Sequence, residues 1–124
     1  PAKIQMEYKG AVPFATVEHV PVFPGCEDAV DRRACFQEKI RRHISKNFNY
    51  PKNAQERGVQ GRVNIMFLIG ADGEIRNIAK RGPDKVLENE AVRIISKLPE
   101  MIPGSHEGKN VDVPFSIPIT FKLH

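Results

Sequence analysis

Long apolar runs, internal repeats and low-complexity segments are missing from this chain of 124 residues. No apolar run approaches the roughly 20 residues that cross a bilayer as a helix, so we expect no membrane span among the printed residues. The lack of a repeating unit argues against solenoid and propeller folds. The chain begins at Pro1 without an initiator methionine or a signal-peptide pattern. We therefore expect a fragment, with any targeting or anchoring segment upstream.

The residue patterns of metal, nucleotide and catalytic sites are missing as well. His19, His43, His106 and His124 show no His-x-x-x-His spacing of a metal site. Cys35 and His43 would lie about 12 Å apart along one helix, which is too far for a thiol–imidazole hydrogen bond. No glycine-rich stretch carries the Gly-Lys-Ser/Thr of a phosphate loop. We expect no catalytic residue, no metal and no cofactor, and therefore not an enzyme.

Cysteine is scarce, with only Cys26 and Cys35 in the chain. They are nine positions apart across the start of a predicted helix, a spacing that can bring the two Cα atoms within disulfide range. An oxidising compartment would favour a bridge, whereas a reducing cytosol would leave two buried thiols. The residues alone leave both alternatives open.

The composition is that of one soluble globular domain, with 40% hydrophobic and 27% charged residues and a formal charge of +4. Several basic residues fall on the first predicted helix, where the aromatic residues lie on the apolar stripe instead of beside the charges. We therefore interpret this face as solvated and predict no nucleic-acid partner. An anionic cell-envelope polymer such as peptidoglycan is an alternative ligand. The basic residues are Arg32, Arg33, Lys39, Arg41, Arg42 and Lys46.

Hydrophobic periodicity predicts two long helices. An apolar residue every fourth position predicts a helix over 31–48, capped by Asp28 or Asp31. A wider apolar face predicts a second helix over 85–98, capped by Asp84.

Alternating residues predict a strand over 62–69 and a return strand over 74–80, joined by a tight turn at Asp72-Gly73. Ile75 and Ile78 are three positions apart, which indicates a bulge in the return strand. We also expect a turn region over 52–61 with a short helical piece at 53–57, and a loop over 101–110.

The last strand, over 111–123, has apolar residues at every odd position and polar residues or proline at every even one. Pro114 and Pro118 are both even, so both remove N–H donors from the same edge. A strand with proline belongs at the margin of a sheet. We expect the strand to pair through its odd residues and to leave an open even edge, whose remaining donors are Asp112, Ser116 and Thr120. Such an edge is either protected against aggregation or used to dock a partner strand.

The fold class is therefore predicted as α+β, a three-stranded antiparallel sheet packed against two helices in the order helix, hairpin, helix, strand. We expect an extended arm over 1–25 and a folded domain over 26–124.

Four segments in this order resemble the TonB C-terminal domain family over about residues 36–123. A fifth, Pro21 to Glu27 with Cys35-Phe36 following, resembles the lead-in of a two-cysteine subgroup of that family. The four are Tyr50-Pro51-x-x-Ala54-x-x-x-Gly58-x-x-Gly61-Arg62-Val63, Phe67-x-Ile69-x-x-Asp72-Gly73-x-Ile75, Glu90-Ala91-x-Arg93-Ile94-Ile95-x-x-Leu98-Pro99, and Pro103-Gly104-x-x-x-Gly108-Lys109-x-Val111 with Pro118-Ile119-x-Phe121-x-Leu123.

The resemblance implies a periplasmic domain of an energy transducer, tethered to the inner membrane by an upstream segment. It implies that the domain binds the TonB box of outer-membrane TonB-dependent transporters alongside the last strand. An ExbB–ExbD-type motor would then transmit force for nutrient uptake. A periplasmic address favours the Cys26–Cys35 bridge. A sensor or cell-wall-binding module of a larger membrane protein is the alternative, and a homodimer through the open edge is a further expectation. The partner-binding residues expected on this basis are Tyr50, Pro51, Val113, Pro114, Phe115, Ser116, Ile117, Pro118, Ile119, Thr120 and Phe121.

Overall fold

The computed structural model describes residues 10–124 and contains three helices and five strands in that range. Residues 1–9 of the predicted arm lie outside the described part. The elements are α1 (Arg32–Asn47), α2 (Lys52–Glu56), β1 (Gly61–Ile69), β2 (Ile75–Arg81), α3 (Lys85–Ser96), β3 (Ser105–His106), β4 (Lys109–Asn110) and β5 (Val113–Phe121).

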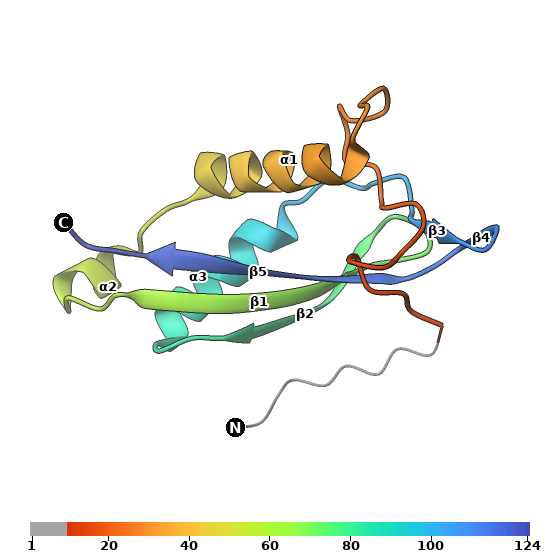
Figure 1. Cartoon of the computed structure of the whole chain (residues 1–124). Coiled ribbons are helices and arrows are strands. Elements are labelled where there is room, and N and C mark those ends of the chain that lie inside the picture. Colours follow the sequence, from red (N-terminus) through yellow and green to blue (C-terminus); the bar gives the residue numbers. More distant parts are fainter. Residues whose placement is uncertain (1–9) are drawn as a thin grey trace.

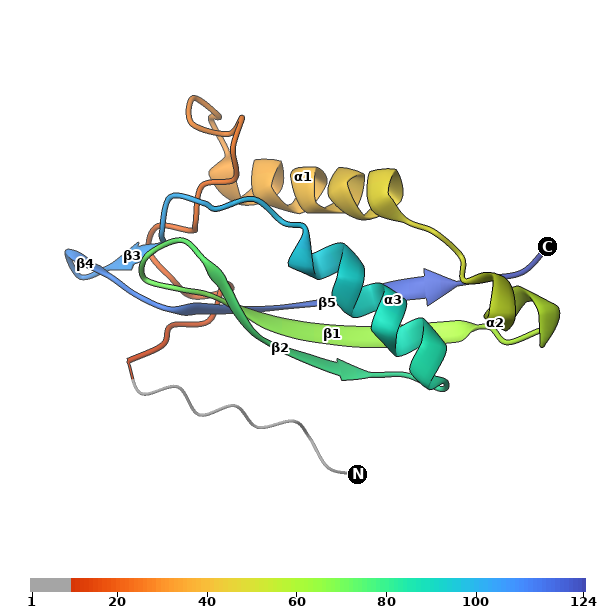
Figure 2. The ribbon, with the colours of Figure 1, turned by 180° about the vertical axis from the view of Figure 1, so that it is seen from behind.

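Strands β2, β1 and β5 form one antiparallel sheet in that order, with β1 in the centre. Helices α1 and α3 run along the sheet, α1 over β5 and α3 over β1 and β2 (Figures 1 and 2). The odd residues of β1 from Val63 to Ile69 face the helices and are buried, because alternate side chains of a strand point to opposite faces. The predicted fold class is confirmed.

Aspartate side chains cap the N-terminal ends of α1 and α3. Helix α1 begins after Asp31, whose side chain accepts a hydrogen bond from the Ala34 N–H at 3.0 Å. Asp84 caps α3 in the same way by accepting from the Val86 N–H at 2.8 Å. Both caps satisfy N–H groups that have no partner within the helix.

The β1–β2 hairpin contains the predicted turn and the predicted bulge. Gly73 has a φ of +88°, and a Cβ atom there would meet the backbone of Met101. Between the pairs Met66–Ala79 and Leu68–Arg76, one residue of β1 lies opposite two of β2, and one of these two, Asn77, adopts a φ of +53°. The extra residue keeps the helix-facing side chains of β2 in contact with the core.

The predicted loop over 101–110 is partly wrong, because β3 and β4 pair within it as a short hairpin. Glu107 and Gly108 both have positive φ values, 52° and 77°, as a two-residue type I′ turn requires. Glutamate is a poor signal for such a turn, so the residue pattern did not predict it.

The described part of the predicted arm packs on the domain. It forms isolated bridges from His19 to Ser105 and from Val22 to Ile102. The apolar side chains of the arm join the same core as the sheet and helices, and the boundary at residue 25 stays a prediction. The buried arm side chains are Phe14, Val17, Val20, Val22 and Phe23.

Candidate functional site

The outer edge of β5 is the candidate site. Strand order places β5 at the margin of the sheet, as its prolines predicted. Pro114 lies opposite Leu68 and Pro118 opposite Asn64. Because proline has no N–H, these cannot be the pairs that exchange two hydrogen bonds with β1. The odd residues of β5 therefore bond to β1, and the backbone groups of the even residues point outward.

The arm covers the first part of this edge. The Val12 N–H donates to the Asp112 carbonyl at 2.9 Å, and the Phe14 N–H donates to the Pro114 carbonyl at 3.4 Å. The residue numbers of the donors and of the acceptors increase in the same direction, so the arm runs parallel to β5. The arm turns away at once, because the Val17 N–H bonds back to the Pro13 carbonyl.

The prediction of an open even edge is therefore wrong at its start, where the arm pairs with Asp112 and Pro114. From Ser116 to Thr120, no backbone hydrogen bond joins the outward groups of β5 to another element within residues 10–124. The open edge is thus shorter than the sequence indicated, and its outward N–H donors are those of Ser116 and Thr120.

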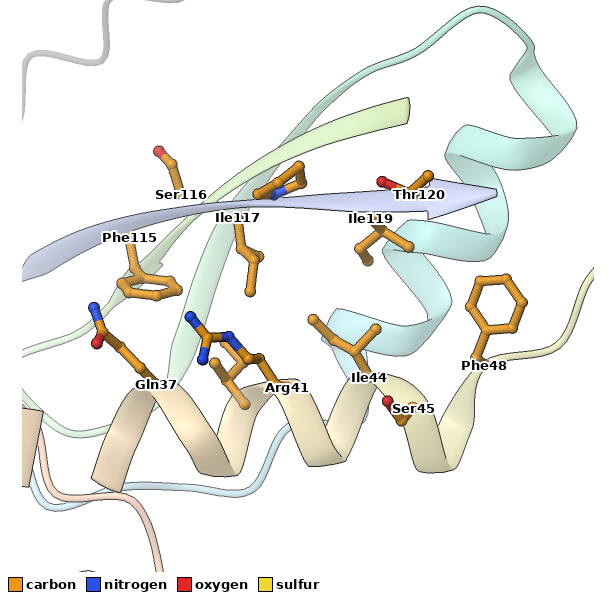
Figure 3. A pocket seen from close by; sticks show the side chains of 12 residues that line it. Gln37, Arg41, Ile44, Ser45, Phe48, Phe115, Ser116, Ile117, Ile119 and Thr120 are labelled. Carbon is orange, nitrogen blue, oxygen red and sulfur yellow. The ribbon is translucent and has the colours of Figure 1, made fainter. Parts of the chain in front are cut away.

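A groove of about 820 Å³ runs between this open edge and α1. Figure 3 shows Phe115, Ile117 and Ile119 pointing from β5 toward the helix. Ile117 and Ile44 are only half-buried, so apolar surface is accessible along the middle of the groove. The lining residues are Gln37, Ile40, Arg41, Ile44, Ser45 and Phe48 of α1 and its C-terminal end, with residues 115–120 of β5.

Aromatic pairs join α1 and β5 at both ends of the groove. At one end the rings of Phe36 and Phe115 lie 5.0 Å apart, and Phe14 of the arm packs 4.9 Å from each. At the other end Phe48 lies 5.0 Å from Phe121. Contacts of this kind add about 0.5–1.5 kcal/mol to the gain from burial. They hold helix and strand at a fixed separation while the groove between them stays open.

The Tyr50-Pro51 segment closes the second end. The Tyr50 ring lies 5.6 Å from Phe121, and its hydroxyl donates to the Val59 carbonyl. Pro51 precedes α2 and stands at its N-cap. Both residues are half-buried.

A buried carboxylate holds this segment, and sequence reasoning missed it. Glu90 on α3 accepts the Asn49 N–H at 2.9 Å and binds the Arg93 guanidinium through both oxygens, at 2.6 and 2.7 Å. Arg93 also donates to the Asn47 carbonyl at 2.6 Å. The pair thereby ties the end of α1 to α3. A glutamate within the apolar face of the predicted helix was the available signal.

The nine predicted partner-binding residues of β5 fall into two sets. The first set is at most 9% exposed and lies in the core of the domain or at the base of the groove. Its members are Val113, Phe115, Ile119 and Phe121. At the open edge, Ser116, Pro118 and Thr120 are exposed and Ile117 is half-buried. Pro114 lies where the arm pairs with β5.

Polar side chains of α1 also line the groove, and no pattern in the sequence predicted this. Gln37 and Arg41 reach from α1 toward β5 (Figure 3), and Ser45 also lines the groove. Among the described residues that line the groove, Arg41 is the only charged one. Arg42 instead pairs with Glu38 at 2.7 Å on the exposed side.

Cys26 and Cys35 form a disulfide, with Cα atoms 5.9 Å apart. The bridge joins the arm to the first turn of α1, and Cys26 is fully buried. Arg33 adds a second connection, because it donates to the carbonyls of Phe14 and Val17 and lies over the Phe14 ring.

Within residues 10–124, no helix is long and apolar enough to cross a membrane. The same residues contain no cluster of three or more side chains that could hold a metal ion.

The family model, the similar sequences and the similar structures all indicate the same protein family. The model of the Gram-negative bacterial TonB protein C-terminal family matches residues 46–123. Protein TonB of Helicobacter pylori is 32% identical over 83 residues, which cover 65% of this chain and 29% of that protein. Protein TonB of Haemophilus influenzae is 32% identical over 65 residues, 51% of this chain and 24% of that protein. The chain thus spans less than a third of the length of these relatives.

Two solved structures have a similar fold. Both are solution structures of the C-terminal domain of Helicobacter pylori TonB. The first has a TM-score of 0.59 and 28% identity, and the match covers 82% of this chain and 91% of that one. The second has a TM-score of 0.50 and 30% identity, with 70% and 92% covered.

Proposed function

Because the chain belongs to the Gram-negative TonB C-terminal family, we propose that it is the periplasmic domain of an energy transducer that binds a transporter peptide along β5. The peptide is the TonB box of an outer-membrane TonB-dependent transporter. It adds as a further strand at the outer edge of residues 115–121. The domain is not an enzyme.

The observation that carries this proposal is the coincidence of an open strand edge with a half-apolar groove. Backbone groups of Ser116, Pro118 and Thr120 face outward beside the side chains that line the groove. Strand addition uses both features, because backbone hydrogen bonds supply affinity and pockets for alternate side chains supply specificity.

The arm already shows this mode of pairing within the chain. Val12 and Phe14 add to the edge at Asp112 and Pro114, and the Phe14 ring packs against Phe115. The carbonyl of Pro114 accepts normally although its nitrogen cannot donate. Pro118 is expected to behave likewise toward a bound peptide, so the prolines shorten the ladder without preventing it.

Force transmission follows from the geometry of such a complex. A peptide pulled along β5 loads its backbone hydrogen bonds together instead of one at a time. We propose that an upstream segment anchors the protein in the inner membrane and that an ExbB–ExbD-type motor pulls through it. Binding to peptidoglycan and pairing of two copies through the open edge remain predictions.

Peptide titration tests the proposal. Isotope-labelled protein is titrated with TonB-box peptides from the same genome while backbone amide shifts are followed. We expect the amides of Ser116 and Thr120 to move, with those of the groove-lining part of α1. The matched variant Thr120→Pro removes one outward donor and should weaken binding several-fold. Unmoved amides at millimolar peptide would refute the proposal.

A second measurement distinguishes peptide binding from the alternative of binding to the cell wall. Pull-down with purified peptidoglycan at low and moderate salt reports any polymer binding through the basic residues of α1, since screening weakens contacts between exposed charges. Retention at low salt without any peptide shift would favour the polymer.

A further inference from the structure

Helix α1 and strand β5 run side by side in the same direction (Figures 1 and 3). Twelve residues of helix separate Phe36 from Phe48, about 18 Å at 1.5 Å per residue. Six residues of strand separate their partners Phe115 and Phe121, about 20 Å at 3.3 Å per residue. The two aromatic pairs therefore hold helix and strand in register across the whole groove.

This register has a consequence for a strand bound at the outer edge of β5. Its side chains that face α1 recur every second residue, about 6.6 Å apart. Side chains four apart on α1 recur about every 6 Å. Successive helix-facing positions of the bound strand therefore meet Gln37, then Arg41, then Ile44 or Ser45, then Phe48.

Arg41 is the α1 residue that faces the second helix-facing position of the bound strand. Figure 3 shows its side chain reaching from α1 toward β5 between Phe115 and Ile117. Within residues 10–124 it forms no ion pair or hydrogen bond, whereas Arg42 is neutralised by Glu38. The wall of the groove thus presents one uncompensated positive charge, with apolar side chains on the C-terminal side.

We propose that Arg41 determines the specificity of the groove by selecting a peptide strand with an acidic side chain at the helix-facing position beside Ile117. Apolar side chains then occupy the helix-facing positions beside Ile44 and Phe48. This inference rests on the proposed function, since it specifies which peptides the same edge accepts. A charge-assisted contact between a carboxylate and a guanidinium is its chemical basis.

A panel of three peptides tests it. All have valine at the other helix-facing positions, and the central helix-facing residue is Glu, Gln or Lys. Dissociation constants are measured by fluorescence anisotropy for the wild-type protein, Arg41→Gln, Arg41→Glu and the matched control Arg42→Gln. Amide shifts of Ser116 and Thr120 report separately whether each peptide occupies the edge.

We expect the wild type to bind the Glu peptide about fivefold more tightly than the Gln peptide at low salt, as for a partly exposed ion pair. The preference should vanish in Arg41→Gln, persist in Arg42→Gln and reverse toward Lys in Arg41→Glu. It should also shrink at 0.5 M salt, where the Debye length is only a few ångströms.

The alternative outcomes separate the two proposals. Peptides that all occupy the edge with equal affinity would overturn the role of Arg41 and leave strand addition standing. A Glu preference that survives in Arg41→Gln would do the same. Peptides that fail to shift Ser116 and Thr120 in any variant would overturn both.

Discussion

Glu90 connects the packing of the core to the candidate site. It is 7% exposed and lies on the apolar face of α3 among Leu87, Ala91 and Ile94. An unpaired carboxylate there would lose much of its hydration. Its bonds to Arg93 and to the Asn49 N–H replace that hydration and fix the chain before Tyr50.

Replacing Glu90 with Gln should therefore destabilise the protein. The amide has one acceptor oxygen and no charge, so it cannot hold Arg93 and Asn49 as the carboxylate does. We expect the free energy of unfolding to fall by about 2 kcal/mol, the scale of hydrogen bonds to a charged group. Urea unfolding measures this. The exposed Glu100→Gln should change it by less than about 0.5 kcal/mol, and equal effects would contradict the role of Glu90.

Asp84 gives the stability a defined pH dependence. The Arg57 guanidinium, with help from the Val86 N–H, lowers the pKa of Asp84 below its usual value. A group with a lowered folded pKa stabilises the protein above the unfolded value near 3.9, and this contribution disappears as pH falls through the folded pKa.

Asp84→Asn keeps an oxygen for the helix cap but removes the charge that pairs with Arg57. We expect the wild type to be more stable than the variant at pH 7 and this difference to shrink below about pH 4. Urea unfolding between pH 7 and pH 2.5 tests the expectation. A difference that stays constant over this range would show that the ionisation of Asp84 does not contribute to the stability.

At this scale the sequence predicted features whose causes are local. Asp31 and Asp84 cap helices because their partners lie two or three residues away. Glu90 and Arg41 have roles that depend on segments far along the chain, Asn49 and β5. The position of Glu90 within an apolar helix face indicated that it is buried, but no local pattern names its partner Asn49, and Arg41 does not differ locally from a surface charge.

The alternation of inward and outward N–H groups along β5 determines at which positions the strand tolerates proline. N–H groups of odd residues bond to β1, and those of even residues face outward. Proline should therefore be accepted at even positions beyond the two that already carry it, and rejected at odd positions.

Thr120→Pro and Ile117→Pro form a matched pair for this rule. We expect Thr120→Pro to cost less than about 1 kcal/mol, because its N–H has no partner in the described residues. Ile117→Pro removes a ladder bond in the middle of β5 and should cost about 3 kcal/mol or more. Thermal and urea unfolding compare the two. Similar losses in both variants would contradict this alternation, and a larger loss in Thr120→Pro would mean that the strand pairs through its even residues.

The arrangement of elements was predictable where one residue type restricts the backbone. Pro114 and Pro118 restricted β5 to a sheet margin, and Asp72-Gly73 restricted the hairpin turn. The parallel pairing of the arm with Asp112 was not predictable, because two hydrogen bonds and one aromatic ring position that segment. Tertiary contacts of this kind have no periodic signal.

For the molecule as a whole, the arm and the sheet form one core joined by the Cys26–Cys35 bridge. Phe14 and Phe23 both pack against Phe36, which is fully buried on α1. The bridge closes a segment between the arm and α1 with a sequence separation of nine. The groove lies outside that segment, between residues 37–48 and 115–120. Stability and peptide binding should therefore depend on the bridge to different extents.

The double variant Cys26→Ser with Cys35→Ser tests this separation. Loop-closure entropy for about ten residues gives a loss of roughly 3 kcal/mol in the free energy of unfolding. Peptide affinity should change by less than about twofold at temperatures where the variant stays folded, because Arg33 still holds the arm through Phe14 and Val17. Urea unfolding and peptide titration of the variant, and of the reduced wild type, measure the two quantities. If affinity falls together with stability, the bridge is needed to keep Phe14 at the end of the groove, and the arm is then part of the binding site.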